Sequence, residues 1–192
     1  KKALKLTETL EMPKPDKTKL RKWDFDTFKQ HHTTGDAYTQ LTDLPKSVKE
    51  IIDVENSENL IIQHNNELAY TQVSDQAKHD GVIIEGLSEA LVNHSDLVQK
   101  YFMTKAVDVD EHRLTALHTA LVNGGIFVYV PKNTVVEHPI QYVVLHDDEQ
   151  ASFYNHVIIV TEESAEVTYV ENYLSTTSGE DNQLNIVSEA VS

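Results

Sequence analysis

The chain has 192 residues and no cysteine, and its 16 Lys and Arg against 31 Asp and Glu give a formal net charge of −15. A domain this acidic repels a phosphate backbone, so we expect no nucleic-acid binding. Without cysteine there is no disulfide, thiolate zinc site or Cys-ligated iron–sulfur cluster within these residues. No apolar run approaches the ~20 residues that span a bilayer, and no signal-peptide pattern is present. The composition therefore predicts a cytoplasmic protein without a membrane segment.

The charge divides the chain into two unequal parts. Residues 1–50 hold 11 Lys and Arg against 8 Asp and Glu, whereas residues 51–192 hold 5 against 23. A basic segment can bind an acidic surface, on a partner or on the same molecule, because complementary charge steers association. Charge runs of this size are more often a solvated face, and we interpret the Lys and Arg of residues 14–22 in that way.

The first predicted element is a short helix. Apolar residues between positions 3 and 10 could line one side of it, and it should end by Met12 because Pro13 and Pro15 cannot continue a helix. Since the chain begins at Lys1 inside this helix, we expect it to be part of a longer protein.

Three aromatic residues follow in a polar segment: Trp23, Phe25 and Phe28. Buried aromatic side chains mainly supply packing area. We therefore interpret this cluster as packing into a core rather than binding a ligand.

The middle of the chain alternates between strand and helix patterns. Runs rich in Val and Ile predict extended segments over residues 48–54, 59–69 and 82–84. The Asn65-Asn66 pair reads as a hairpin turn. A change to helical spacing then predicts two helices with Ser88 and Ser95 as N-caps.

A connecting helix is expected within residues 106–124. Its apolar side recurs at helical spacing over about residues 110–123. Gly124 then supplies a left-handed stop, because glycine adopts positive φ without a steric penalty.

From residue 125 onward the chain contains only strand-like runs separated by short polar turns. The corner after Val130 resembles the corner after Val160, 30 residues later, and such a period is typical of a stacked array. We therefore expect an α+β fold class in which an N-terminal α/β domain over residues 1–105 is followed, over residues 125–192, by the first coils of a right-handed parallel β-helix, a mostly β solenoid. A β-sandwich is the alternative. Because residues 184–191 would begin another coil without a cap, we expect the chain to continue beyond Ser192.

One long stretch resembles a known family. Residues 117–140 (Leu117-His-Thr-Ala-Leu-Val-Asn-Gly-Gly-Ile-Phe-Val-Tyr-Val-Pro-Lys-Asn-Thr-Val-Val-Glu-His-Pro-Ile140) join a helix, a Gly-Gly pair, a strand ending in Val-Pro-Lys and a V-x-x-P-I step. This order resembles the SufB/SufD family, and residues 13–25 and 157–191 resemble it more loosely. The likeness covers nearly the whole chain and about the first half of such a protein. His118 stands where the family usually has Asn. The Trp23-Asp-Phe25 stretch and the lack of cysteine favour the SufD branch.

The resemblance implies a function that composition alone does not. It implies a non-enzymatic, cytoplasmic scaffold and interaction subunit of the Suf iron–sulfur cluster assembly complex. Its partners would be a SufB-like paralogue and a SufC-like ABC ATPase, with a homodimer as a further arrangement. Iron or an iron–sulfur cluster would be bound transiently in the intact complex. The family's proposed ligands lie outside these residues, so we expect no cofactor here.

Ten histidines suggest a metal-site hypothesis, chiefly for His138, His146 and His156. Zinc or iron needs three or four N or O ligands converging on one point. The sequence has no H-x-H or H-E-x-x-H run that would bring ligands together. We therefore predict no metal-binding residue among them.

A cluster of adjacent acids, Asp147, Asp148 and Glu149, suggests a catalytic hypothesis. Solenoid polysaccharide lyases set such acids against a basic residue, yet no Lys or Arg follows Lys132. We predict no catalytic or cofactor-binding residue. The alternative function, from a different class, is a β-solenoid carbohydrate-active or carbohydrate-binding protein.

Overall fold

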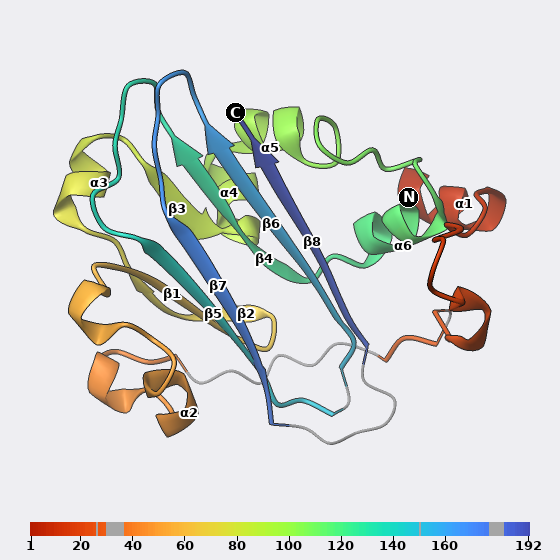
Figure 1. The fold of residues 1–192 in the computed structure, drawn as a ribbon, viewed down its shortest axis with the longest axis horizontal. Helices are drawn as coiled ribbons and strands as arrows, with labels where there is room; N and C mark the ends of the chain where they lie inside the picture. The colour runs from red at the N-terminus through yellow and green to blue at the C-terminus, as the bar shows by residue number, and fades with distance from the viewer. Residues whose placement is uncertain (26, 30–36, 150, 177–182) are drawn as a thin grey trace.

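Two four-stranded sheets pack face to face, with short helices on their outer faces (Figure 1). The computed structural model describes residues 1–25, 27–29, 37–149, 151–176 and 183–192.

The first sheet has the strand order β2-β1-β5-β7. Its strands are β1 (Asn59–His64), β2 (Glu67–Gln72), β5 (Ile140–His146) and β7 (Tyr169–Ser175). β1 and β2 form the predicted hairpin, in which Asn65 adopts a φ of 54°. β1, β5 and β7 run parallel to one another.

The second sheet has the strand order β3-β4-β6-β8. Its strands are β3 (Ile83–Gly86), β4 (Gly124–Val130), β6 (Phe153–Thr161) and β8 (Leu184–Val191). β3 is antiparallel to β4, whereas β4, β6 and β8 are parallel. Each sheet thus combines strands from the first hundred residues with strands after residue 123.

The expected solenoid is wrong. We expected an α+β domain followed by coils of a right-handed parallel β-helix. The chain instead forms an α/β fold with two mixed sheets, which are neither closed nor curled. The physical reason is that β1 and β3 pair with β5 and β4, so the later strands extend sheets that the earlier segment begins. The carbohydrate alternative depended on the solenoid and loses its basis.

The internal repeat nevertheless has a structural counterpart. The two corners lie side by side, with Asn133 N donating to Glu163 O at 3.0 Å and a parallel bridge between Val135 and Glu166. Asn133 and Ser164 both have a φ of 60°. The repeat therefore reflects parallel strands joined by similar corners, which two facing sheets satisfy without a solenoid.

Six α-helices and three short 3₁₀ helices are formed by the described residues. The α-helices are α1 (Lys2–Thr9), α2 (Lys46–Lys49), α3 (Asp75–His79), α4 (Leu87–Asn93), α5 (Ser95–Tyr101) and α6 (Arg113–Leu121); the 3₁₀ helices are η1 (Leu20–Lys22), η2 (Leu41–Asp43) and η3 (Val54–Asn56). The extended segment expected over residues 48–54 is wrong, because α2 covers its start, with Val48 buried, and η3 begins at its end. Neither Ser88 nor Ser95 is an N-cap, because α4 begins at Leu87 and α5 at Ser95 itself. No helix in the described ranges is both long and apolar enough to cross a bilayer.

The core has three layers of apolar contact. The largest lies between the sheets and includes Ile61, Ile126, Tyr142, Phe153 and Val157. A second packs α2 and its neighbours on the outer face of the first sheet, and a third packs α4 and α5 on the outer face of the second. Both faces of each sheet are therefore covered over much of their area, which explains the continuous Val and Ile runs of β4, β5 and β6.

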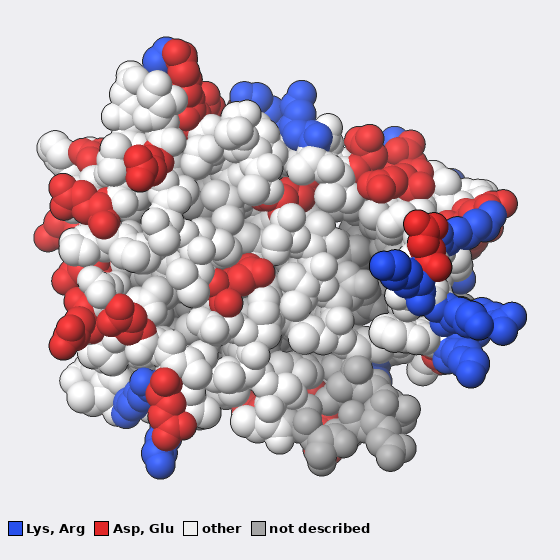
Figure 2. Space-filling view, in the orientation of Figure 1, with Lys and Arg blue, Asp and Glu red and all other residues white. Residues whose placement is uncertain are grey.

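The charge is spread unevenly over the surface. Figure 2 shows Asp and Glu scattered over much of the visible face, and several Lys and Arg near the end where α1 lies, with others at the upper edge and lower left. Residues 1–25 contribute 8 Lys and Arg against 4 Asp and Glu, a net of +4, and the other residues 8 against 27, a net of −19. Residues 1–25 therefore form a basic end of the molecule, and the other residues form an acidic body.

The glycine that requires an unusual backbone is Gly125, not Gly124 as expected. α6 ends at Leu121, Gly124 begins β4, and Gly125 has a φ of 136°. A Cβ atom on Gly125 would lie 1.9 Å from the carbonyl oxygen of His156 in the paired strand β6. Both the backbone angle and the close approach of β6 therefore demand glycine.

We predict that Gly125→Ala lowers the free energy of unfolding by more than about 2 kcal/mol. Gly81→Ala is the matched control, because Gly81 also has a positive φ, of 75°, but its Cβ would lie 3.7 Å from the nearest side chain. It should cost only about 1 kcal/mol of backbone strain. Equilibrium urea denaturation of both variants measures the difference, and equal losses would contradict the proposed close approach.

Candidate functional site: a buried His–His–Glu chain

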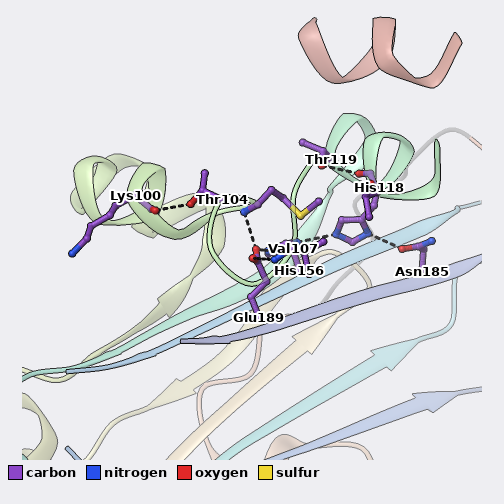
Figure 3. Close-up of polar contacts among 10 residues, drawn as sticks. Lys100, Thr104, Val107, His118, Thr119, His156, Asn185 and Glu189 are labelled. Carbon is purple, nitrogen blue, oxygen red and sulfur yellow. Dashed lines mark hydrogen bonds and ion pairs between the residues drawn. The ribbon is translucent and has the colours of Figure 1, made fainter. Parts of the chain in front are cut away.

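Three titratable side chains form a hydrogen-bonded chain beneath α6 (Figure 3). His118 comes from α6, His156 from β6 and Glu189 from β8. Their exposed fractions are 0%, 0% and 1%. Buried ionisable groups are costly unless they are paired, so this cluster is the strongest candidate for a special role.

The local sequence explains how these side chains meet. α6 begins with a capping box, in which His112 Nδ1 accepts from Thr115 N and Thr115 Oγ1 accepts from His112 N. The cap fixes the start of the helix that places His118 over the sheet. In β8, residues two apart share a face, so Asn185 and Glu189 both point toward α6.

The geometry of the chain determines where protons lie. His118 Nδ1 is 2.7 Å from Asn185 Oδ1, His118 Nε2 is 2.9 Å from His156 Nδ1, and His156 Nε2 is 2.8 Å from Glu189 Oε1. An ionised carboxylate only accepts hydrogen bonds, so His156 Nε2 carries a proton and donates it to Glu189.

Glu189 is also held by backbone donors. Met103 N donates to Oε1 at 2.8 Å and Val107 N donates to Oε2 at 3.2 Å. Burial raises the pKa of Glu189, but hydrogen bonds from His156 and from these two amides lower it by more, so its pKa lies below the usual range. The ionised carboxylate therefore fastens the loop after α5 to β8.

His118 is neutral in this environment. Burial, reinforced by the neighbouring His156, lowers its pKa to about 4, although the hydrogen bond to Asn185 opposes the shift. Aromatic rings complete the enclosure, with Phe102 4.5 Å from His156 and Tyr154 6.3 Å from His118 between ring centroids.

This arrangement favours a structural role over a chemical one. The side chains are closed to solvent, and the facing nitrogens of the two rings are hydrogen-bonded to each other, so a substrate has no access to them. Within the part of the chain that the structure describes, no three His, Asp or Glu side chains are grouped so that they could hold a metal ion. The chain of contacts instead ties α6, β6, β8 and the loop after α5 together.

The three histidines considered from sequence are not brought together. His138 precedes β5 and His146 ends it, so they are separated by the strand, roughly 20 Å for six steps. His146 stacks on Phe153 in the space between the sheets, with ring centroids 5.6 Å apart, whereas His156 faces α6 on the other side of its sheet. Burial lowers the pKa of His146, and neither of its ring nitrogens has a hydrogen-bond partner among the described residues.

The acids considered from sequence lie at a turn with structural partners. Asp147 Oδ2 is 2.8 Å from His64 Nε2, and its Oδ1 accepts from Asn65 Nδ2 at 2.9 Å. Burial raises the pKa of Asp147, but the hydrogen bonds from His64 and Asn65 lower it by more, leaving the pKa below its usual value. Asn65 Oδ1 also accepts from the amides of Asp147 and Asp148, so this turn braces the β1–β2 hairpin. Glu149 is exposed.

Sequence reasoning missed Glu189 and Asn185. The sequence did contain one indication, a glutamate within the strand-like run LNIVSEAV. Charged residues are rarely buried unless they are paired, so a glutamate buried in such a strand would need a partner. In the sequence, His118 is distinguished only by standing where the family usually has Asn, which does not predict its contacts with His156 and Asn185.

We predict that Glu189→Gln lowers the free energy of unfolding by about 2 kcal/mol or more, because an NH2 group replaces one of the two oxygens that accept from buried backbone amides and leaves one amide unsatisfied. Glu67→Gln, at an exposed position of β2, is the control and should change stability by less than about 0.5 kcal/mol. Urea denaturation at neutral pH provides the measurement. A loss at Glu189 no larger than at Glu67 would show that the buried contacts of the Glu189 carboxylate contribute nothing.

We also predict that stability falls as the pH is lowered from about 6.5 to about 4. In this window His118 is protonated in the unfolded chain, with its ordinary pKa of 6.5, but not in the folded chain, where its pKa is about 4. The unfolded state binds more protons, so lowering the pH favours unfolding, by about 3 kcal/mol from this residue.

His118→Asn isolates this contribution, because the amide can donate and accept hydrogen bonds but does not titrate. The stability advantage of the parent over His118→Asn should therefore shrink between pH 7 and pH 4. Parallel pH curves for the two proteins would contradict the assignment of a neutral His118.

Comparison with known proteins places the chain in a family. The family model described as "SufBD protein N-terminal region" matches residues 18–142. The "Iron-sulfur cluster assembly protein SufD" of Bacillus subtilis is 48% identical over 190 residues, which cover 98% of this chain and 44% of that protein. A SufBD family protein of Pyrococcus horikoshii is 30% identical, over 68% of this chain and 31% of that protein.

The chain spans less than half the length of these curated relatives. The resemblance to the SufB/SufD family expected from sequence is confirmed, and within it the similarity to a SufD protein extends over almost the whole chain. On the family model and on this identity, the chain belongs to the SufBD protein family and carries that family's N-terminal region.

Proposed function

We propose that this chain is the N-terminal region of a non-enzymatic scaffold subunit that serves iron–sulfur cluster assembly. The observation that carries the proposal is the 48% identity, over 98% of the chain, to a protein named for that process. The partners would be a SufB-like paralogue and a SufC-like ABC ATPase, and a homodimer would be the alternative assembly. Iron or a cluster would be cargo of the intact complex, which would work in the cytoplasm.

The described residues support a scaffold rather than an enzyme in two ways. The most unusual titratable groups, His118, His156 and Glu189, are closed to solvent and hold segments of the chain together. The turn acids Asp147 and Asp148 brace a hairpin.

The edges of the sheets support an interaction role. β7 and β8 each form one edge of a sheet in the described part of the chain, β2 and β3 forming the opposite edges, and Leu184 and Ile186 of β8 are exposed. A strand edge offers backbone N–H and C=O groups to a further strand, and apolar side chains beside it add buried area. Subunits that pair through strands would use such an edge.

The test is a pull-down of the tagged full-length protein from its own cells under anaerobic conditions, with iron and sulfide assayed in the eluate. We expect an ABC-type ATPase and a second SufBD family protein to be recovered with it. Recovery of the protein alone, with neither partner and no iron above an unrelated control, would contradict the proposal.

A matched pair of variants tests the strand edge. Ile186→Glu places a charge on β8 and should reduce recovery of the second SufBD protein about tenfold, the effect of losing one good apolar contact. Val54→Glu places the same charge on an exposed residue outside both sheets and should leave recovery unchanged. Both variants should keep the parent's melting temperature, and equal recovery would exclude β8 from the interface.

A further inference from the structure

A basic, aromatic pocket lies at the N-terminal end of the chain. Residues 11–25 form a curved loop, and Arg113 at the start of α6 closes it. The loop lines an open hollow of about 830 Å³. Its apolar lining includes Met12, Leu20, Trp23 and Phe25. Its charged lining comprises Lys14, Lys19, Arg21 and Arg113 against Glu11 and Asp24, and Lys14 is paired with Glu11 at 2.7 Å, so the lining keeps an excess of positive charge.

Hydrogen bonds to Arg113 hold the loop of the pocket in place. Arg113 N donates to Glu11 O at 2.9 Å, and Arg113 Nε donates to Thr7 O at 3.1 Å, which fastens the loop and α1 to α6. Pro13 and Pro15 further limit the backbone of the loop, because each fixes its own φ. A preformed pocket loses little conformational entropy on binding.

Two of the three aromatic residues of this segment, Trp23 and Phe28, are exposed and Phe25 is half-buried, contrary to the core packing expected from sequence. Trp23 is 63% exposed and Phe28 is 49% exposed. Trp23 stacks on Phe25, with ring centroids 6.1 Å apart and an interplanar angle of 18°. Tryptophan and arginine are the residues most enriched among those that dominate binding energy at protein interfaces, and an exposed tryptophan on a soluble domain suggests such an anchor.

The charge of the pocket defines its ligand. Residues 1–25 carry a net charge of +4, and Figure 2 shows this basic end against an acidic body with a net charge of −19. The body repels a long polyanion or an anionic membrane that would extend beyond the pocket. A short acidic segment can instead place its carboxylates at the basic rim without reaching the acidic body.

We propose that this pocket binds an acidic segment of a partner protein, with a bulky apolar side chain against Trp23 and Phe25 and carboxylates paired with Lys19 and Arg21. The proposal goes beyond the scaffold function above and does not depend on it. It concerns a face built by α1, the loop over residues 11–25 and α6, whereas the assembly partners were argued from relatives and from the edge of β8.

The test measures the fluorescence anisotropy of labelled peptides with the full-length protein. The probes are peptides of about twelve residues, the length of a typical docked segment, in which a central Leu-Phe pair is flanked by Asp and Glu. A second peptide has Ser in place of Leu-Phe, and a third has Gln in place of the acids. We expect only the first to bind, and its affinity to fall as salt is added, because salt screens exposed charges.

Variants locate the site. Trp23→Ala and Arg21→Glu should each weaken binding about tenfold or more, the loss expected for an anchor residue. Val92→Ala, at an exposed apolar residue of α4, is the matched control and should bind like the parent. Because Trp23, Arg21 and Val92 are exposed, all three variants should melt with the parent.

Several outcomes would overturn the proposal. Equal binding of the Ser peptide would show that charge alone acts, and unchanged binding by Trp23→Ala would place the site elsewhere. A single-stranded oligonucleotide or a phosphatidylserine vesicle that binds more tightly than the acidic peptide, and loses binding in Arg21→Glu, would assign the pocket to another class of ligand. Absence of peptide binding would remove the docking site, while the pull-down would still test the scaffold function.

Discussion

The fold depends on the pairing of early strands with late ones: β1 with β5 and β3 with β4. Without these contacts the first hundred residues would hold one hairpin and a short strand, and the later strands would lack neighbours on one side. The pairing brings the two inner faces together around Tyr142 and Phe153, each of which is buried. It also forces Gly125 against the backbone of His156, since β4 and β6 are neighbours in the same sheet.

The buried polar groups then act as links between elements that strand pairing alone does not join. Between the sheets, Gln63 of β1 accepts from Gly125 N and from Tyr142, and donates to Asn65 O. On the helical side, Glu189 joins β8 to the loop after α5, and His118 joins α6 to both β6 and β8. Such groups stabilise only when every partner is in place, so they make one arrangement of the elements preferable to its alternatives.

Hydrophobic patterns predicted the strands of this chain better than their partners. The runs that became β4 to β8 and the Asn65 hairpin are visible in sequence because Val and Ile cluster between polar turns. Periodicity does not say which strand lies beside which, and the similar corners at Asn133 and Ser164 fit several architectures with parallel neighbours. The candidate site could not be predicted in this way, since Glu189 is distinguished by its burial and by its hydrogen bonds with His156 and the amide of Met103, which only the folded chain brings together. The predicted burial of Trp23 is wrong, because the presence of aromatic residues in a segment does not show whether their side chains are buried or exposed.

The two proposed binding regions are neighbours, and one end of the buried His–His–Glu chain lies beside both of them. Trp23 of the basic end and Leu184 of β8 line one hollow of about 490 Å³, with Asn185 beside them. Asn185 is the residue that accepts from His118, so the outer end of the His–His–Glu chain lies at that hollow. A strand that pairs with β8 and displaces it would also move Asn185, which contacts His118 of α6. α6 begins with Arg113, which lines the basic pocket, so such a movement would reach the pocket through this helix. Because His118 of α6 contacts Asn185 of β8 directly and Glu189 of β8 through His156, the strand edge and the helix beside the pocket are linked by the same buried side chains.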